Sequence, residues 1–404
     1  MEQQVLDYDI WAREHRSDPQ ALYARMRAES PIHRQLGPVS GNPFWFLTRY
    51  DDCVAFLKDQ RFGKQIDKHL SPEAVRRWWG DGDPTFDPVN HHMLNLDPPD
   101  HTRLRALIHK AFTPRMIENL RPRISAIADE LIDHIEGQSE IDLLEDFGFP
   151  LPITVIAELL GVPVSDQDKF REWTKALVFG GSPESSRVAA LEFAMYTNNL
   201  IDERAQSPRD DLIMALVQAE EAGDKLDRAE LMSMIFLLLV AGHETTVNLI
   251  GNGTLALMQH PDQLDKLRAQ PGLIRTAVEE MLRYNGPVET TTLRMALTDD
   301  AEIGGVHIPQ GEGVLAALVA ANRDPAAFPN PDMFDITREP NKHIAFGNGI
   351  HYCVGAPLAR LEGTIAISRL VSRLPHLELA VEPEALKWND NLLLHGMAAL
   401  PVRL

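Results

Sequence analysis

One short stretch of the sequence, residues 343–359, constrains the chain more than any other. It places Cys353 after a turn that is opened by Gly347 and Gly349. Glycine permits positive φ angles and lets the backbone approach a flat ligand closely. An apolar-periodic run follows, and the N-terminus of the helix it predicts would stabilise a thiolate. The stretch therefore predicts a metal-binding thiolate; the alternative is a buried apolar cysteine beside a turn.

Composition limits the class of protein. A chain of 404 residues with 44% hydrophobic content can bury a large core, and no linker divides it, so we expect a single domain over residues 1–404. Cys53 and Cys353, the two cysteines, cannot form a disulfide framework. We find no long apolar span or secretory signal and expect a cytoplasmic monomer without a membrane anchor. The formal charge of −20 argues against nucleic acid as a partner.

A long helix is predicted between residues 227 and 260. Asp227 and Glu230 have the D-x-x-E form of an N-terminal capping arrangement, and Pro261 ends the apolar pattern. At 1.5 Å per residue the helix would span roughly 45–50 Å, enough to cross the whole molecule.

The middle of this helix is polar, with the sequence Ala-Gly-His-Glu-Thr-Thr at residues 241–246. Burying polar groups is costly, so the interruption needs a reason. A zinc-binding H-E-x-x-H pair fails because residue 247 is valine. A kink that faces solvent is one explanation. The other is an oxygen-activation site, in which Ala241 and Gly242 leave room above a metal and Glu244 with Thr245 delivers protons.

Three motifs together resemble one family. The order Phe-Gly-x-Gly-x-His-x-Cys-x-Gly resembles the haem-binding signature of the cytochrome P450 family, the haem-thiolate monooxygenases. The sequence at 100–105 is similar to the haem-facing helix of that family, and residues 241–246 are similar to its oxygen-binding helix. The residues that carry the signature are Phe346, Gly347, Gly349, His351, Cys353 and Gly355.

The resemblance implies roles for further residues. Cys353 would bind the haem iron, with His101, Arg105, Arg294 and His351 as partners of the haem propionates; by itself the pair on the 100–105 helix is also typical of a solvated basic face. A buried structural network would join Glu280, Arg283 and Arg338, although most E-x-x-R pairs are exposed. The substrate pocket would be lined by Trp78, Trp79, Leu237, Val240, Val288, Thr292 and Leu393.

The fold implied is mainly α with small β-sheets, a triangular prism-like helical domain with the long helix over the haem. Patterning predicts a single helix over 117–135 and a second stretch of two helices between 170 and 204, joined at 180–183. An irregular segment is expected over 61–99. Short strands are expected at 44–48, 290–296, 301–306 and 313–318, and a hairpin near 389–394.

The implied reaction inserts one oxygen atom from O2 into a mainly hydrophobic small molecule, by hydroxylation or epoxidation. No C-x-x-C-H motif is present, so haem b would be held without covalent bonds. Electrons would come from a ferredoxin or flavodoxin with its reductase. Two alternatives stay open, a peroxygenase driven by hydrogen peroxide and a non-catalytic haem-thiolate sensor. The expected docking face for the redox partner contains Arg103, Lys110, Arg115, Lys342 and Arg360.

Overall fold

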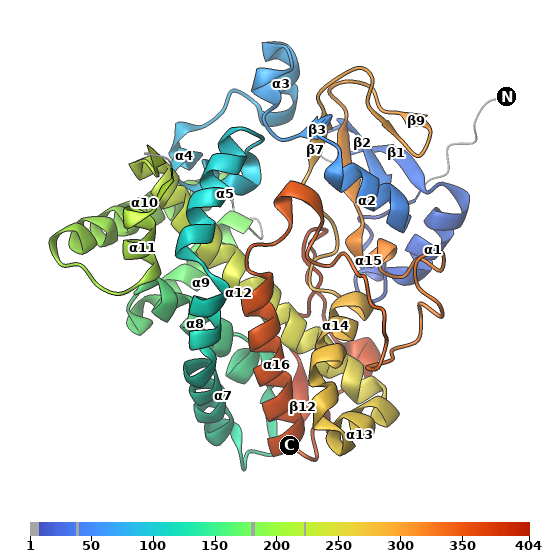
Figure 1. The fold of residues 1–404 in the computed structure, drawn as a ribbon. Helices are drawn as coiled ribbons and strands as arrows, with labels where there is room; N and C mark the ends of the chain where they lie inside the picture. The colour runs from blue at the N-terminus through green and yellow to red at the C-terminus, as the bar shows by residue number, and fades with distance from the viewer. Residues whose placement is uncertain (1–7, 38–39, 179–181, 222–223) are drawn as a thin grey trace.

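The computed structural model describes residues 8–37, 40–178, 182–221 and 224–404, and it is organised around one central helix, α12 (Figure 1). Helix α12 spans Arg228–Gln259. As the sequence predicted, Asp227 and Glu230 form a complete capping box at its start, and Pro261 opens the next helix. Most of the second half of α12 is buried, because helices pack on it from several sides.

Several helices pack directly on α12, and four of them do so most extensively. They are α4 (Asp87–Asn90), α8 (Pro150–Leu160), α14 (Ile274–Tyr284) and α16 (Ala356–Arg373). The remaining α-helices are α1 (Gln20–Glu29), α2 (Tyr50–Lys58), α3 (Pro72–Trp79), α5 (Asp100–Ala111), α6 (Pro114–Asn119), α7 (Arg121–Ile135), α9 (Gln167–Val178), α10 (Pro183–Gln206), α11 (Leu212–Gln218), α13 (Pro261–Ala269) and α15 (Leu318–Ala321).

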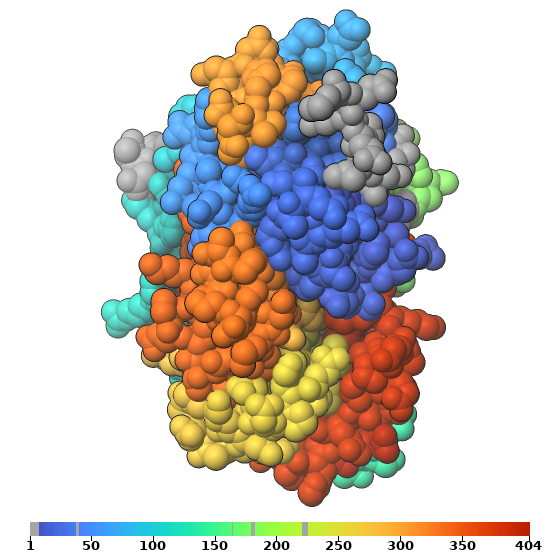
Figure 2. All heavy atoms as spheres, turned by 90° about the vertical axis from the view of Figure 1, so that its right-hand side faces the viewer, coloured from blue at the N-terminus to red at the C-terminus, as the bar shows by residue number. Residues whose placement is uncertain are grey.

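The larger sheet has five strands in the order β1-β2-β10-β7-β3. Only β10 and β2 run parallel, pairing Gly313 with Phe44 and Ala316 with Leu47. Figure 2 shows the face on which the N-terminal segments lie beside residues of the last quarter of the chain. The strands of this sheet are β1 (Ile32–Leu36), β2 (Pro43–Leu47), β3 (Phe62–Gly63), β7 (Arg294–Ala296) and β10 (Gly313–Ala316).

A second, three-stranded sheet has the order β11-β12-β4 and is antiparallel throughout. Its strands are β4 (Glu140–Asp142), β11 (Glu378–Leu379) and β12 (Pro401–Arg403). Two short strand pairs complete the sheet structure: β5 (Glu220–Glu221) with β6 (Asp224–Lys225), and β8 (Glu302–Ile303) with β9 (Val306–His307). The mainly helical fold with small sheets agrees with the prediction.

Three predictions of secondary structure need correction. The strand expected over 301–306 is instead the hairpin of β8 and β9, which turns at Gly304 and Gly305. The expected single helix over 117–135 is divided at Leu120 into α6 and α7. Pro122 explains the break, because proline has no N–H and fits the first turn of a new helix better than a helix interior. The segment 61–99, expected to be irregular, contains the helices α3 and α4 and several single helical turns.

Two further expectations concern chain reversals. Near 389–394 the chain does reverse: the Asn389 N–H donates to the Gly396 carbonyl at 2.9 Å, and Trp388 pairs with Met397. The predicted junction at 180–183 lies partly outside the described residues, which resume at Ser182 before α10.

Helix α12 is also the one described helix that is long and apolar enough to cross a membrane, with a mean hydropathy of 1.5 over the relevant segment. However, 61% of that segment is buried inside the protein. Central helices of globular proteins share this composition, because they are surrounded by other helices.

Candidate active site

The candidate site begins at the loop that carries Cys353, between a single turn of helix (η8, Gly349–His351) and α16. The Cys353 N–H donates to the Phe346 carbonyl at 3.0 Å, which closes the loop. Gly347 and Gly349 have φ angles of 73° and 72°. A Cβ at Gly349 would lie 2.3 Å from the Leu57 carbonyl oxygen, so the loop requires glycine there for conformation and for space.

Cys353 lies just before α16, and part of the residue is exposed. Burial by the surrounding protein raises the pKa of Cys353, while the backbone N–H groups of Gly355 and Ala356 and the guanidinium of Arg105 act in the opposite direction. Donors of this kind stabilise a thiolate once a cation binds to the sulfur. The geometry thus supports the predicted role of Cys353 as a metal ligand more than the alternative of an inert cysteine.

Cys53 provides the contrast within the same chain. It is completely buried in α2, and burial raises its pKa far above the ordinary value. Among the described residues, no three His, Cys, Asp or Glu side chains gather so that they could hold a metal ion. The protein therefore offers a single thiol ligand at Cys353, which fits a metal that arrives with its other ligands already bound in a cofactor.

Positively charged and imidazole side chains gather close to the loop. The rings of His101 and His351 lie 4.4 Å apart, and Arg105 donates to the carbonyls of Ile350 and Tyr352 at 2.9 and 2.7 Å. Neither ring nitrogen of His101 has a hydrogen-bond partner among the residues that the structure describes. An unsatisfied buried imidazole in such a place points to a missing polar partner.

The pKa values of the residues in this cluster also indicate a missing anionic partner. Burial lowers the pKa of His351 to about 2, with further lowering by the charges of Arg294, His101, Lys64 and Arg105. Burial also lowers the pKa of Arg294 to about 10. The cluster has an excess of positive charge in a buried place, which an anionic ligand with two carboxylates, such as haem, would neutralise.

Lys64 belongs to this cluster, and sequence analysis missed it. Its ammonium group donates to the Thr292 hydroxyl, while its backbone N–H donates to Asp97 at 2.7 Å. Burial lowers the pKa of Lys64 to about 7, and the charge of Arg294 lowers it further. The sequence offered only a weak signal, a lysine directly after the buried strand β3.

The polar stretch of α12 differs in detail from the acid–alcohol pair that was predicted. The Thr245 hydroxyl donates to the Ala241 carbonyl at 3.0 Å, one helical turn earlier. The Glu244 carboxylate instead lies 3.3 Å from His243 Nε2. The two side chains therefore contact different partners and are not bonded to each other in this arrangement.

Gly242 has a packing role that the sequence did not indicate. A Cβ at this position would lie 3.1 Å from Ile156 on α8. The glycine therefore allows α8 to approach α12 closely, whereas Ala241 is exposed on the same turn.

Comparisons with known proteins agree with this geometry. The family model described as "Cytochrome P450" matches residues 185–270 and 272–395. Cytochrome P450 107B1 of Saccharopolyspora erythraea is 51% identical over 94% of each chain. The chain belongs to the cytochrome P450 family. A second relative of this P450, the polyketide biosynthesis cytochrome P450 PksS of Bacillus subtilis, is 48% identical over 97% of each chain.

Solved P450 structures confirm the fold. A myxobacterial P450, CYP267B1, crystallised with myristic acid, matches this P450 with a TM-score of 0.92 and 50% identity, covering 98% of this chain and 99% of that one. P450BioI, solved with an acyl carrier protein that bears a hexadecenoic acid, matches with a TM-score of 0.87 and 41% identity over 97% of this chain and 99% of its own. The chain is therefore a P450 monooxygenase with a haem-thiolate cofactor.

The structure brings together the three residues of the expected buried network. Arg283 donates to both carboxylate oxygens of Glu280 at 2.8 Å, and both side chains are completely buried. Arg338 donates to the same carboxylate at 3.1 and 3.2 Å. Arg283 also donates to the carbonyls of Asn322, Pro331 and Met333, so it joins α14 to the segment that precedes the cysteine loop.

The residues expected to line the substrate pocket have different surroundings. Trp78 donates to the Gly311 carbonyl at 3.0 Å, whereas Trp79 is 54% exposed and we leave it out of the proposed pocket. Val288 pairs with Leu394 beside Leu393, and Thr292 contacts Lys64. Leu237 and Val240 lie half-buried on α12.

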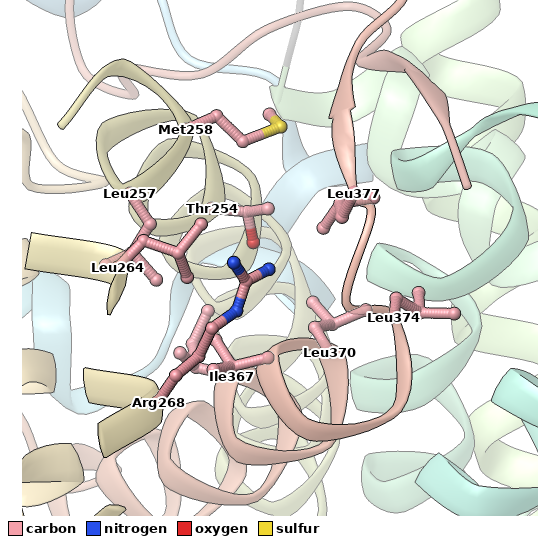
Figure 3. Close-up of a pocket in the computed structure, with 10 residues that line it drawn as sticks. Thr254, Leu257, Met258, Leu264, Arg268, Ile367, Leu370, Leu374 and Leu377 are labelled. Carbon is pink, nitrogen blue, oxygen red and sulfur yellow. The ribbon is translucent and has the colours of Figure 1, made fainter. Parts of the chain in front are cut away.

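Two cavities lie away from the cysteine loop. Figure 3 shows an apolar one between α12, α13 and α16, where Thr254 and Arg268 lie among leucine side chains. Its volume of about 10 Å³ is enough for one water. A second cavity of about 370 Å³ lies among α6, α7, α8 and α11. Neither includes any residue predicted for the site.

Proposed function

We propose that the Cys353 thiolate would bind the iron of a non-covalently held haem b in a single-domain enzyme. The observation that carries this proposal is the Cys353 thiol next to a buried cluster in which the cations outnumber the nearby Asp97 carboxylate. Haem held by a thiolate supplies the activation of O2. His101, Arg105, Arg294 and His351 would bind its propionates, with Lys64 as an additional cation, and Phe346, Gly347 and Gly355 would shape the loop beneath it.

The reaction inserts one oxygen atom of O2 into a C–H or C=C bond and reduces the other to water, which consumes two electrons and two protons. Thr245 would hold a proton on its hydroxyl above the haem, and Glu244 would resupply protons from the surface of α12. For that relay, Thr245 must rotate away from the Ala241 carbonyl. Ala241, which is exposed, would keep this side of the helix open, whereas Gly242 packs against Ile156 on α8.

The two electrons would come from a ferredoxin or flavodoxin with its reductase, in the cytoplasm and with the enzyme as a monomer. Tyr352, next to Cys353, is exposed at the surface where such a partner would dock. Two of the cations expected there already have carboxylate partners, since Arg103 pairs with Glu230 and Arg360 with Glu279. The docking charge would rest mainly on the exposed residues Arg115 and Lys342.

A mainly hydrophobic substrate is supported by the relatives. The myxobacterial structure contains myristic acid, P450BioI carries a fatty acid on its carrier protein, and a relative that is 42% identical is a vitamin D(3) 25-hydroxylase. The half-buried apolar residues Leu237, Val240, Val288 and Leu393 agree with such a ligand.

The test of the proposal is a pair of cysteine variants. Reduced wild-type enzyme with CO should show the long-wavelength Soret band of thiolate-ligated haem. Cys353→Ser should lose this band, whereas Cys53→Ser should keep it. A band at the shorter wavelength of histidine-ligated haem in the wild type would contradict the proposal. Turnover with NADH and redox partners, compared with turnover with hydrogen peroxide, would separate the monooxygenase from the peroxygenase. A complete lack of product would indicate the sensor.

A further inference from the structure

A buried carboxylate lies directly behind the proposed substrate-binding segment, Val288–Thr292. Glu289 is 1% exposed, and its backbone is fixed on both sides. Its N–H donates to the Leu393 carbonyl at 2.9 Å, and its carbonyl accepts from the Leu318 N–H at 2.8 Å. Side chains alternate along extended backbone, so Glu289 points away from the side on which Val288 and Thr292 lie.

Three side chains from three different elements face the Glu289 carboxylate. Tyr23 on α1 donates its phenolic hydrogen to Oε1. Arg16, which precedes α1, donates from Nη1 to Oε1 and Oε2 at 3.4 and 3.3 Å. His395 lies with Nδ1 3.9 Å from Oε2. All three are at least nine-tenths buried, so water does not compete for the carboxylate.

The tautomer of His395 follows from its other contact. Its Nε2 lies 2.8 Å from Asn285 Oδ1, an acceptor, so Nε2 carries the hydrogen and Nδ1 keeps a lone pair. Burial lowers the pKa of His395 to about 3, helped by the charges of Arg16 and Arg323, so the ring is neutral. Trp388 stacks on it with centroids 4.5 Å apart, which fixes its orientation.

Glu289 therefore has two sets of partners that depend on its proton. When ionised, the carboxylate accepts from Arg16 and Tyr23 and faces the lone pair of His395 Nδ1, which gives no attraction. When protonated at Oε2, it can donate to that lone pair, and the charge on Arg16 loses its counter-ion. Arg16 keeps only carbonyl acceptors, on Ile10 and Asn391.

We propose that Glu289 is a positioning residue for the substrate-binding segment. Protonation of its carboxylate switches the partner of Glu289 from Arg16 to His395. In the ionised state the segment is fastened to the N-terminal part of the chain. In the protonated state it is drawn toward the 391–395 turn, which carries Leu393. This proposal rests on the proposed function, because it assigns substrate affinity to the position of Val288, Thr292 and Leu393.

The ionised and the protonated states of the Glu289 carboxylate are both accessible near neutral pH. Burial raises the pKa of Glu289 to about 7, while Arg16 and Tyr23 act in the opposite direction. Arg16, Tyr23 and His395 are the titratable groups of the surrounding elements that face it. Since Tyr23 and His395 stay neutral in this range, Glu289 is the group of the cluster that titrates.

Two measurements on the haem-loaded enzyme test the proposal between pH 5.5 and 8.5. The first is hydrogen exchange of the 288–294 and 391–395 peptides, in which wild type is compared with Glu289→Gln at each pH so that the intrinsic pH dependence cancels. The second is the Kd of myristic acid from the low-to-high spin shift. The carboxyl group of this probe titrates equally in both proteins, so the ratio of Kd values isolates Glu289.

As the pH falls below 7, the hydrogen-exchange protection of the two peptides in the wild type, divided by that in the variant, should fall at least threefold. Over the same pH range, the ratio of the wild-type Kd to the variant Kd should rise about three- to tenfold. Glu289→Gln should show the low-pH behaviour of the wild type at every pH. Tyr23→Phe should move the midpoint upward, because it removes a donor to the ionised carboxylate. Glu312→Gln is the control: this carboxylate lies directly before β10 and pairs with Arg34, so the substitution should leave both profiles unchanged.

Identical pH profiles for wild type and Glu289→Gln would overturn the proposal, as would an exchange step without a change in Kd. The exchange measurement needs no ligand, so it decides the role of Glu289 even if myristic acid gives no spin shift. A missing spin shift would count against the hydrophobic substrate of the proposed function instead.

Discussion

Thr246 on α12 donates its hydroxyl to Glu362 on α16 at 3.3 Å, and both side chains are buried. This hydrogen bond joins the helix that carries Thr245 to the helix that begins after Cys353. The second carboxyl oxygen of Glu362 has no hydrogen-bond partner among the described residues. The contact therefore connects the two sides of the haem site through a carboxylic acid that is isolated from water.

Replacing Glu362 should change how stability depends on pH. Burial raises the pKa of Glu362 well above its ordinary value, so above pH 4.5 the folded state holds a proton that the unfolded chain releases, and wild-type stability falls as pH rises. Glu362→Gln removes this decline. Urea unfolding should show the variant about 1–3 kcal/mol more stable relative to wild type at pH 8 than at pH 5. An equal difference at both pH values, as expected for the exposed control Glu382→Gln, would contradict the prediction.

Two alanine substitutions in the cysteine loop should separate the stability lost through backbone strain at a positive φ from the stability lost through a steric clash. Gly347→Ala introduces a side chain at a positive φ without a close contact, and should cost about 1–2 kcal/mol. Gly349→Ala adds a collision with the Leu57 carbonyl and should cost several kcal/mol more. Thermal unfolding measures both variants, and equal losses would show that the loop can move away from Leu57.

The Glu280–Arg283 pair should be important for stability. Arg283→Met leaves Arg338 as the remaining cation beside the buried Glu280 carboxylate and removes the donor of three carbonyls, so it should destabilise the protein by about 3–5 kcal/mol. Arg13→Met breaks an exposed pair with Asp390 and should change stability by less than about 1 kcal/mol. Urea midpoints for both variants check the prediction, and similar shifts would argue against a structural role for the buried pair.

The Thr245 hydroxyl should affect the coupling of NADH consumption to product formation more than it affects folding. Thr245→Val keeps the shape of the side chain but cannot hold a proton, so NADH consumption should continue while more of it ends as hydrogen peroxide. Product and peroxide are measured per NADH consumed. Thr246→Val is the matched control, because its hydroxyl contacts Glu362 instead; it should retain coupling. Unchanged coupling in Thr245→Val would remove the proposed proton role.

Local signals were sufficient to predict several features from the sequence. The capping box at Asp227 and the stop at Pro261 fixed the limits of α12, because both act within one helical turn. The order of residues around Cys353 indicated the haem loop for the same reason. These features depend on residues close together in the chain.

Other features could not be predicted, because they depend on distant contacts. Lys64 becomes important only when the fold places it beside Arg294, and Glu289 only when α1 and the 391–395 turn enclose it. Gly242 looked like space above a metal, but its neighbour is Ile156 on α8. The break between α6 and α7 is an exception: it had a local cause in Pro122, which the apolar periodicity across it concealed.

The parallel pairing of β2 with β10 has a consequence for biosynthesis. The first strands of the larger sheet, with Phe44, Phe46 and Leu47, cannot complete their pairing until Gly313–Ala316 has left the ribosome. At roughly 5–20 residues per second, this wait lasts on the order of ten to fifty seconds. During that time the apolar edge of β2 is exposed in the nascent chain, so the N-terminal segment is where we expect chaperones to bind before the enzyme is complete.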